Sequence, residues 1–178
     1  MLALRAAAAY RFGMDRRAAF LIAATAVLIS APAIAARPQI LFAQGQWAAV
    51  RYGAQCEAVA RPLLPAARRQ PQSRAGFSFV PAGRRVGEFH ARLSRVPRPG
   101  SSVMLTIGER PFLLVARGDW AWSRGPAQDS AIIDAARAAT SMRIESRDGS
   151  GRRFTDRYLL AGAPTAIDAA AAACAGKI

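Results

Sequence analysis

Alternation of apolar and polar residues predicts a chain built mostly of strands. Phe89, Ala91 and Leu93 alternate with polar neighbours, and Phe77 and Phe79 flank Ser78 in the same way. This period of two is typical of half-buried strands. Segments rich in proline, glycine and arginine separate the strands, notably residues 61–75, 97–100 and the hairpin-length loop 108–111. Strands are therefore predicted over residues 47–52, 77–79, 88–94, 103–107, 112–115, 120–122, 142–147 and 154–160.

Two helices interrupt this strand pattern. Each is preceded by a glycine and has a proline near its start, at Pro126 and at Pro164, where the missing N–H of proline leaves no hydrogen bond unmade. Buried stripes with helical spacing follow, formed by Ile132, Ala135, Ala136 and Ala139 and by Ile167, Ala170, Ala171 and Cys174. No regular strand–helix–strand alternation occurs, so antiparallel pairing is expected. The prediction is a mainly β (α+β) fold: an antiparallel β-sandwich or barrel-like sheet with two short helices, the last at the C-terminus.

The first 35 residues have the three parts of a secretory signal peptide. A positive stretch at residues 14–17 precedes an uncharged apolar run of 12 residues, 18–29, and the sequence Ala33-Ile34-Ala35 fits the A-x-A cleavage pattern. Residues 1–13 precede this pattern, so Met14 is a better translation start than Met1. The apolar run is shorter than the about 20 residues that span a bilayer, although an uncleaved anchor or a buried helix is the alternative. We predict a signal peptide over 1–35 and a single β-rich domain over 36–178, periplasmic or secreted, with no transmembrane segment after cleavage.

The predicted export determines how the two cysteines are interpreted. Cys56 and Cys174 both lie after the predicted cleavage site, near opposite ends of the domain. In an oxidising compartment such a pair is most simply one disulfide, and two buried free thiols are the alternative. With two cysteines and a single histidine, the chain lacks the ligands of most zinc sites and the H-E-x-x-H and C-x-x-C motifs. No metal or other cofactor is predicted.

The chain is strongly basic, with a formal net charge of +14. Lys177 is the only lysine among 25 basic residues and asparagine is absent, a bias that GC-rich codons produce without selection for an anionic partner. Residues 1–35 carry four arginines and one aspartate, so +11 of the +14 remains after cleavage. The arginines are spread out and form no run of five to eight, as a nucleic-acid patch would. The expected partners are anionic envelope components or another protein, not a specific nucleic acid.

Few residues suggest chemistry. His90 is the only imidazole and faces away from Phe89 and Leu93; an exposed strand histidine is the simplest interpretation, and a hydrolase using His90 with an acidic residue is the alternative. A G-x-S-x-G motif is absent. Trp120 and Trp122 lie on one face of a short extended piece and, with His90, form a candidate binding surface for sugars, bases or a protein. Burial of the tryptophans in the core is the competing interpretation.

The C-terminal half resembles the invasion-associated locus B family of exported bacterial proteins. The similar stretch runs from about Val103 to Cys174 and includes the segments Phe112-Leu113-Leu114, Ala121-Trp122, Ala131–Arg137, Met142–Arg147, Asp156–Gly162 and Ala166–Cys174. The resemblance implies a mainly antiparallel, non-enzymatic protein of the periplasm or envelope. We therefore expect no catalytic residues, and a function that consists of binding.

Overall fold

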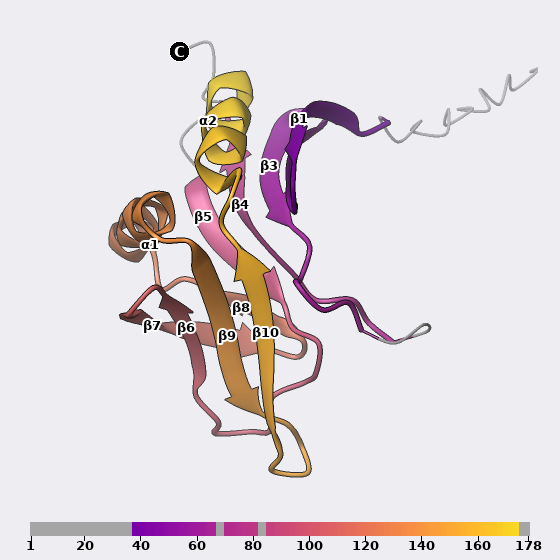
Figure 1. Cartoon of the computed structure of the whole chain (residues 1–178), viewed down its shortest axis with the longest axis vertical. Helices are drawn as coiled ribbons and strands as arrows, with labels where there is room; N and C mark the ends of the chain where they lie inside the picture. The colour runs from indigo at the N-terminus through magenta and orange to yellow at the C-terminus, as the bar shows by residue number, and fades with distance from the viewer. Residues whose placement is uncertain (1–36, 67–69, 82–84, 175–178) are drawn as a thin grey trace, which may run out of the picture. The chain divides into compact units, whose positions relative to one another are not determined.

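The computed structural model describes residues 37–66, 70–81 and 85–174 (Figure 1). The predicted signal peptide lies outside the described residues. Within the described part of the chain, no helix is long and apolar enough to cross a membrane.

Within the described residues, ten antiparallel strands form one sheet in the order β1-β2-β3-β4-β5-β8-β7-β6-β9-β10. The first five strands are neighbours in chain order and form a meander. The next three follow in reverse chain order, so that β8 pairs with β5 and β6 pairs with β9. Strand β10 then forms the edge of the sheet. The described part of the chain confirms a mainly β, antiparallel fold with two helices. It does not confirm a sandwich or barrel, because the sheet in this part does not close. The strands are β1 (Gln39–Gln44), β2 (Trp47–Tyr52), β3 (Gln55–Ala60), β4 (Arg74–Val80), β5 (Arg85–Arg92), β6 (Val103–Ile107), β7 (Arg110–Arg117), β8 (Trp120–Trp122), β9 (Ser141–Arg147) and β10 (Arg153–Leu159).

Both helices pack on the same apolar face of the sheet (Figure 1). Helix α1 (Pro126–Ala138) lies against β5, and α2 (Ala163–Cys174) lies against β2 and β3. The alternation in the strands supplies this face: Phe77 and Phe89 are fully buried and meet edge to face, with ring centroids 5.4 Å apart. The opposite face of β3, β4 and β5 is left uncovered by the helices, and it carries the polar residues of the site.

The two ends of the open sheet approach each other. The Trp47 indole N–H donates to the Leu159 carbonyl over 2.8 Å, and the Leu63 backbone N–H donates to the Arg157 carbonyl over 2.7 Å. These bonds pair two backbone carbonyls on the outer edge of β10, which would otherwise be unpaired. The buried Trp47 on β2 thus helps to hold β10, the last strand of the sheet, in place.

The sequence predicted most of these elements but missed two strands. The bounds of β2 and β6 are as expected, and the helices begin at Pro126 and Ala163. No strand was predicted for residues 39–44 or 55–60, which form β1 and β3. The segment 61–75 was predicted as loop, but β4 already begins at Arg74, and the turn before β7 has only two residues because Arg110 pairs with Ile107.

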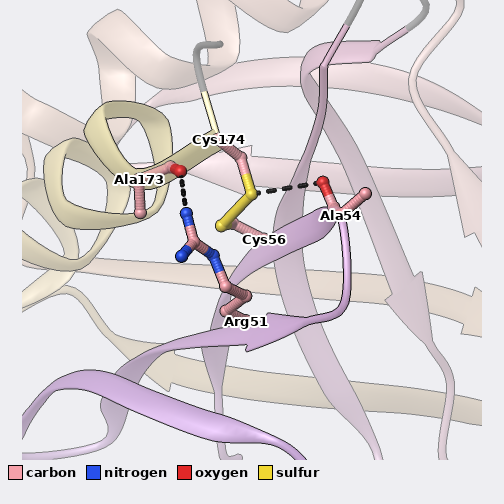
Figure 2. Close-up of a disulfide and its surroundings, with 5 residues drawn as sticks. All are labelled: Arg51, Ala54, Cys56, Ala173 and Cys174. Carbon is pink, nitrogen blue, oxygen red and sulfur yellow. Dashed lines mark hydrogen bonds between the residues drawn. A yellow bond between two sulfur atoms is a disulfide. The ribbon is translucent and has the colours of Figure 1, made fainter. Parts of the chain in front are cut away.

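A disulfide joins Cys56 on β3 to Cys174 in the last turn of α2, as predicted (Figure 2). Both cysteines are buried. Beside them, the Arg51 guanidinium on β2 donates a hydrogen bond to the Ala173 carbonyl at the end of the helix (Figure 2). A cation at this position also interacts favourably with the negative end of the helix dipole. The covalent bond and the charged contact together hold the end of α2 on the sheet.

Candidate functional site

Three neighbouring strands place a carboxylate, a hydroxyl and an imidazole on the face opposite the helices. Glu57 on β3 is directly across from Ser78 on β4, and Gly76 on β4 is directly across from His90 on β5. Their neighbours Cys56, Phe77 and Phe89 point to the core, so strict alternation turns these polar side chains outward.

The three polar groups are connected and buried. His90 Nε2 lies 2.6 Å from Glu57 Oε1, and His90 Nδ1 lies 3.3 Å from Ser78 Oγ. The exposed fraction is 5–7% for each of the three residues. With Nε2–H donating to Glu57, Nδ1 accepts the Ser78 hydroxyl; in the protonated ring, Nδ1–H donates instead. Both ring nitrogens of His90 therefore have a partner in either state, as buried polar groups require.

Gly76 makes the contact between His90 and Glu57 possible. The two residues are two strands apart, so the imidazole has to cross β4 to reach the carboxylate. At the crossing position, directly opposite His90, Gly76 has no side chain. The backbone is also close there, since a Cβ built on Gly76 would lie 2.5 Å from the Ala58 carbonyl oxygen. Position 76 therefore accepts no other residue without separating β3 from β4.

Burial alone would raise the pKa of Glu57, but the hydrogen bond from His90 and the charges of His90 and Arg74 outweigh it and leave the pKa below its ordinary value. The carboxylate is thus held in its charged form inside a largely desolvated site. A buried carboxylate is stable in this form only when it is paired.

Two tryptophans lie beside this polar group. Trp120 and Trp122 on β8 stack with ring centroids 6.2 Å apart and an interplanar angle of 17°, and both remain partly exposed. The Arg74 guanidinium lies 5.1 Å from the centroid of the Trp120 ring, a cation–π contact. The Trp120 and His90 rings are also neighbours, 6.1 Å apart. Strand pairing places both tryptophans beside the imidazole, because Trp122 is directly opposite His90 and Trp120 is two residues further along the same strand.

Together these side chains line a pocket of about 280 Å³, completed by Gln55 and Glu88. The structure therefore brings the three predicted residues, His90, Trp120 and Trp122, to one pocket. The expectation of an exposed histidine was wrong: the ring is buried between Glu57, Ser78 and Trp120. Core burial applies to Trp47, which is 1% exposed, but not to the other two tryptophans.

A β-bulge in β5 adjoins the pocket. The pairing shifts so that Ser78 faces Glu88 while Phe79 faces Val86, which leaves Gly87 as the extra residue, with φ +80°. The Phe89 backbone N–H donates over 2.9 Å to the buried carboxylate of Asp129 in α1. Bulges often re-aim side chains beside functional sites. Here the bulge and Asp129 fix the strand on both sides of Glu88.

Sequence reasoning missed Glu57, Ser78 and Gly76. Glu57 did leave a signal, because it is the one charge in the otherwise apolar run 56–60. Ser78 between two phenylalanines was recognised only as part of an alternating strand. Without β3, which was not predicted, no pattern along the chain could pair Glu57 with His90.

Replacing Gly76 with alanine is expected to destabilise the fold by about 2–3 kcal/mol, because the new methyl group overpacks the contact between β3 and β4. Denaturant unfolding of Gly76→Ala against wild type measures this loss. Gly149→Ala is the matched control, since a Cβ there meets no atom within 4 Å; it should change stability by less than about 0.5 kcal/mol. Equal effects of the two substitutions would contradict the close approach at Gly76.

Among residues 37–66, 70–81 and 85–174, no cluster of three or more histidine, cysteine, aspartate or glutamate side chains could hold a metal ion. Comparisons with protein-family models, with curated proteins and with solved structures find no match to this chain.

Proposed function

We propose that the chain is an exported, non-enzymatic envelope protein of the invasion-associated locus B type, and that it binds a carbohydrate in the pocket beside Trp120 and Trp122. The disulfide supports an oxidising compartment, periplasmic or extracellular. The resemblance of residues 103–174 to that family supports the same location.

The stacked tryptophan pair is the observation that carries the carbohydrate assignment. A sugar ring has apolar C–H faces and a rim of hydroxyl groups. Partly exposed indoles supply an apolar, electron-rich surface for such a face. Around them, Glu57 and Glu88 accept hydrogen bonds, Arg74 donates, and Gln55 does both. Small-molecule sites combine apolar walls with a few placed polar groups in the same way.

The alternative is a hydrolase, favoured by the order hydroxyl–imidazole–carboxylate in Ser78, His90 and Glu57, which is the order of a catalytic triad. Ser78, however, lies within β4 and is paired on both sides, with Glu57 and with Glu88. Acyl transfer also needs donors aimed at the developing oxyanion, and backbone N–H groups committed to strand pairing do not supply them. The pocket therefore fits binding better than hydrolysis.

Binding is expected to weaken about tenfold or more in Trp122→Ala, because one aromatic contact contributes about 1 kcal/mol beyond its buried area and 1.4 kcal/mol is a factor of ten. Titration of wild type and variant with soluble oligosaccharides of N-acetylated hexosamines, followed by tryptophan fluorescence and calorimetry, measures the change. The control is Tyr52→Ala, an exposed aromatic on β2 outside the pocket. If wild type binds none of these oligosaccharides, or if Tyr52→Ala weakens binding as much as Trp122→Ala, the proposal is contradicted.

The hydrolase alternative has its own test. Wild type, His90→Ala and Ser78→Ala are assayed on ester and glycoside substrates. We expect no turnover by any of the three. Turnover by wild type that both substitutions abolish would replace the binding proposal with the hydrolase.

A further inference from the structure

A second pocket, of about 410 Å³, lies between the β9–β10 hairpin and the loop that precedes β6. None of its lining residues belongs to the tryptophan pocket, so a ligand here would bind independently of any carbohydrate. Three arginines line it, Arg98, Arg147 and Arg153, together with the hydroxyl groups of Ser101, Ser102 and Thr155. The volume is within the range of sites for small ligands.

The three arginines form an unneutralised cluster. Arg147 and Arg153 are directly opposite each other in the β9–β10 pair, an arrangement that destabilises a sheet when both charges have the same sign. Glu145 is the one carboxylate in the pocket lining, and it accepts a hydrogen bond of 3.0 Å from Arg143, which lies outside the pocket. Among the described residues, Arg98 and Arg153 have no carboxylate partner for their side chains. An anion between them would remove the repulsion.

Hydrogen bonds position two of the three arginines, Arg98 and Arg147. The Arg98 N–H donates to the Arg147 carbonyl over 2.9 Å, and the Ser101 N–H closes a turn onto the Arg98 carbonyl over 3.0 Å. Pro99 and Gly100, with φ +78° at the glycine, give this turn the signature of type II. On the other side, the Arg147 guanidinium donates to the Gly151 carbonyl over 2.9 Å, and Arg98 Nη1 lies 3.8 Å from where a Gly151 Cβ would be. Both guanidinium groups are therefore positioned against the same residue.

The hydroxyl groups add donors to the charges. Ser101 Oγ is shielded from solvent and has no hydrogen-bond partner among the described residues, although Ser101 lines the pocket. Buried polar atoms without partners are rare in folded proteins. Ser102 and Thr155 are exposed at the pocket and offer two more hydroxyls. A ligand with several oxygens would satisfy this donor set.

We propose that this pocket binds a phosphate group, carried by a lipid headgroup or by a soluble phosphorylated molecule. Planar guanidinium forks match the oxygens of phosphate. Three guanidinium groups and three hydroxyls exceed what the two oxygens of one carboxylate can use, but suit a tetrahedral oxyanion. The proposal gives a defined location to the envelope contact that the basic charge suggested.

The test is an NMR titration of the folded protein with glycerol 3-phosphate. We expect shift changes centred on the backbone amides of Ser101 and Gly151. The double variant Arg98→Gln/Arg153→Gln should weaken binding at least tenfold, since it removes two of the three guanidinium groups and leaves only Arg147, which donates to the Gly151 carbonyl. The matched control, Arg61→Gln/Arg124→Gln, loses the same charge from exposed arginines outside the pocket and should keep most of the affinity.

Sedimentation with phosphatidylcholine vesicles, with and without phosphatidylglycerol, separates the two sources of phosphate. Retention that needs phosphatidylglycerol and is lost only in the site variant, without glycerol 3-phosphate binding, supports a headgroup ligand. Binding of glycerol 3-phosphate with the same variant dependence supports a soluble phosphorylated ligand. Equal weakening in the site variant and the control would mean attraction by net charge alone and would overturn the site, as would no response to either probe.

Discussion

Replacing both cysteines with alanine is expected to lower the free energy of unfolding by about 4–5 kcal/mol. The disulfide closes a loop with a sequence separation of 118 residues, and in the chain-entropy model a cross-link over a loop of this size restricts the unfolded chain by that amount. Alanine leaves no buried hydroxyl behind, so the measured change reports mainly on the cross-link. Most domains have only about 5–15 kcal/mol in total, so this loss is a large part of the stability.

Urea or guanidinium unfolding of wild type and Cys56→Ala/Cys174→Ala, with and without reductant, measures the effect. Reductant should lower the midpoint of wild type toward that of the variant and leave the variant unchanged. Arg51→Gln is an informative companion, because it removes the guanidinium contact with the end of α2 but keeps the disulfide (Figure 2); its loss should be much smaller. A loss below about 1 kcal/mol for the double variant would contradict this expectation and indicate that the unfolded chain is already restricted without the cross-link.

Breaking the Glu57–His90 pair is the second large expected effect. Glu57→Ala should destabilise the protein by about 3–5 kcal/mol at neutral pH, because removing one member of a buried pair leaves the other uncompensated. Glu57→Gln should lose less, since its amide oxygen can still accept the hydrogen bond from His90 Nε2. The measurement is denaturant unfolding of wild type and both variants.

The pH dependence checks the same pair. The native state lowers the pKa of Glu57, so as the pH falls the unfolded chain takes up the proton first and the stability from the carboxylate is lost. The stability difference between wild type and Glu57→Gln should therefore be fully present above the ordinary pKa of about 4.5 and disappear below the native one. Asp156, whose pKa burial raises, is present in both proteins and cancels in the difference. A difference that stays constant between pH 3 and 7 would contradict the lowered pKa.

The missed strands show where prediction from the sequence stopped. β10 was readable because Phe154, Asp156 and Tyr158 alternate with exposed residues on a strand with one buried face. β1 gives no such alternation: its residues are partly or fully exposed throughout, and pairing with β2 determines its conformation. Strand order was equally hidden, since reversing β6, β7 and β8 within the sheet changes no local pattern.

The candidate site was likewise predictable only in part from the sequence. Alternation correctly turned His90 away from the core and put Trp120 and Trp122 on one face. Whether that face is exposed depends on residues from other strands: Glu57 and Ser78 cover the imidazole, and they are 33 and 12 residues away from His90 in the chain. The arginine cluster of the second pocket has the same origin, because Arg98 and Arg147 meet only through a loop that packs against β9.

By itself, the sequence determined the faces of the strands, the starts of the helices and the inward position of Cys174, because backbone period and proline geometry are local properties. Only the tertiary structure decided which strands are neighbours, and hence that a buried Glu57–His90 pair adjoins a tryptophan stack and that three arginines share one pocket. These contacts join residues far apart in the chain, and their geometry follows from sheet order and register, which no local pattern encodes.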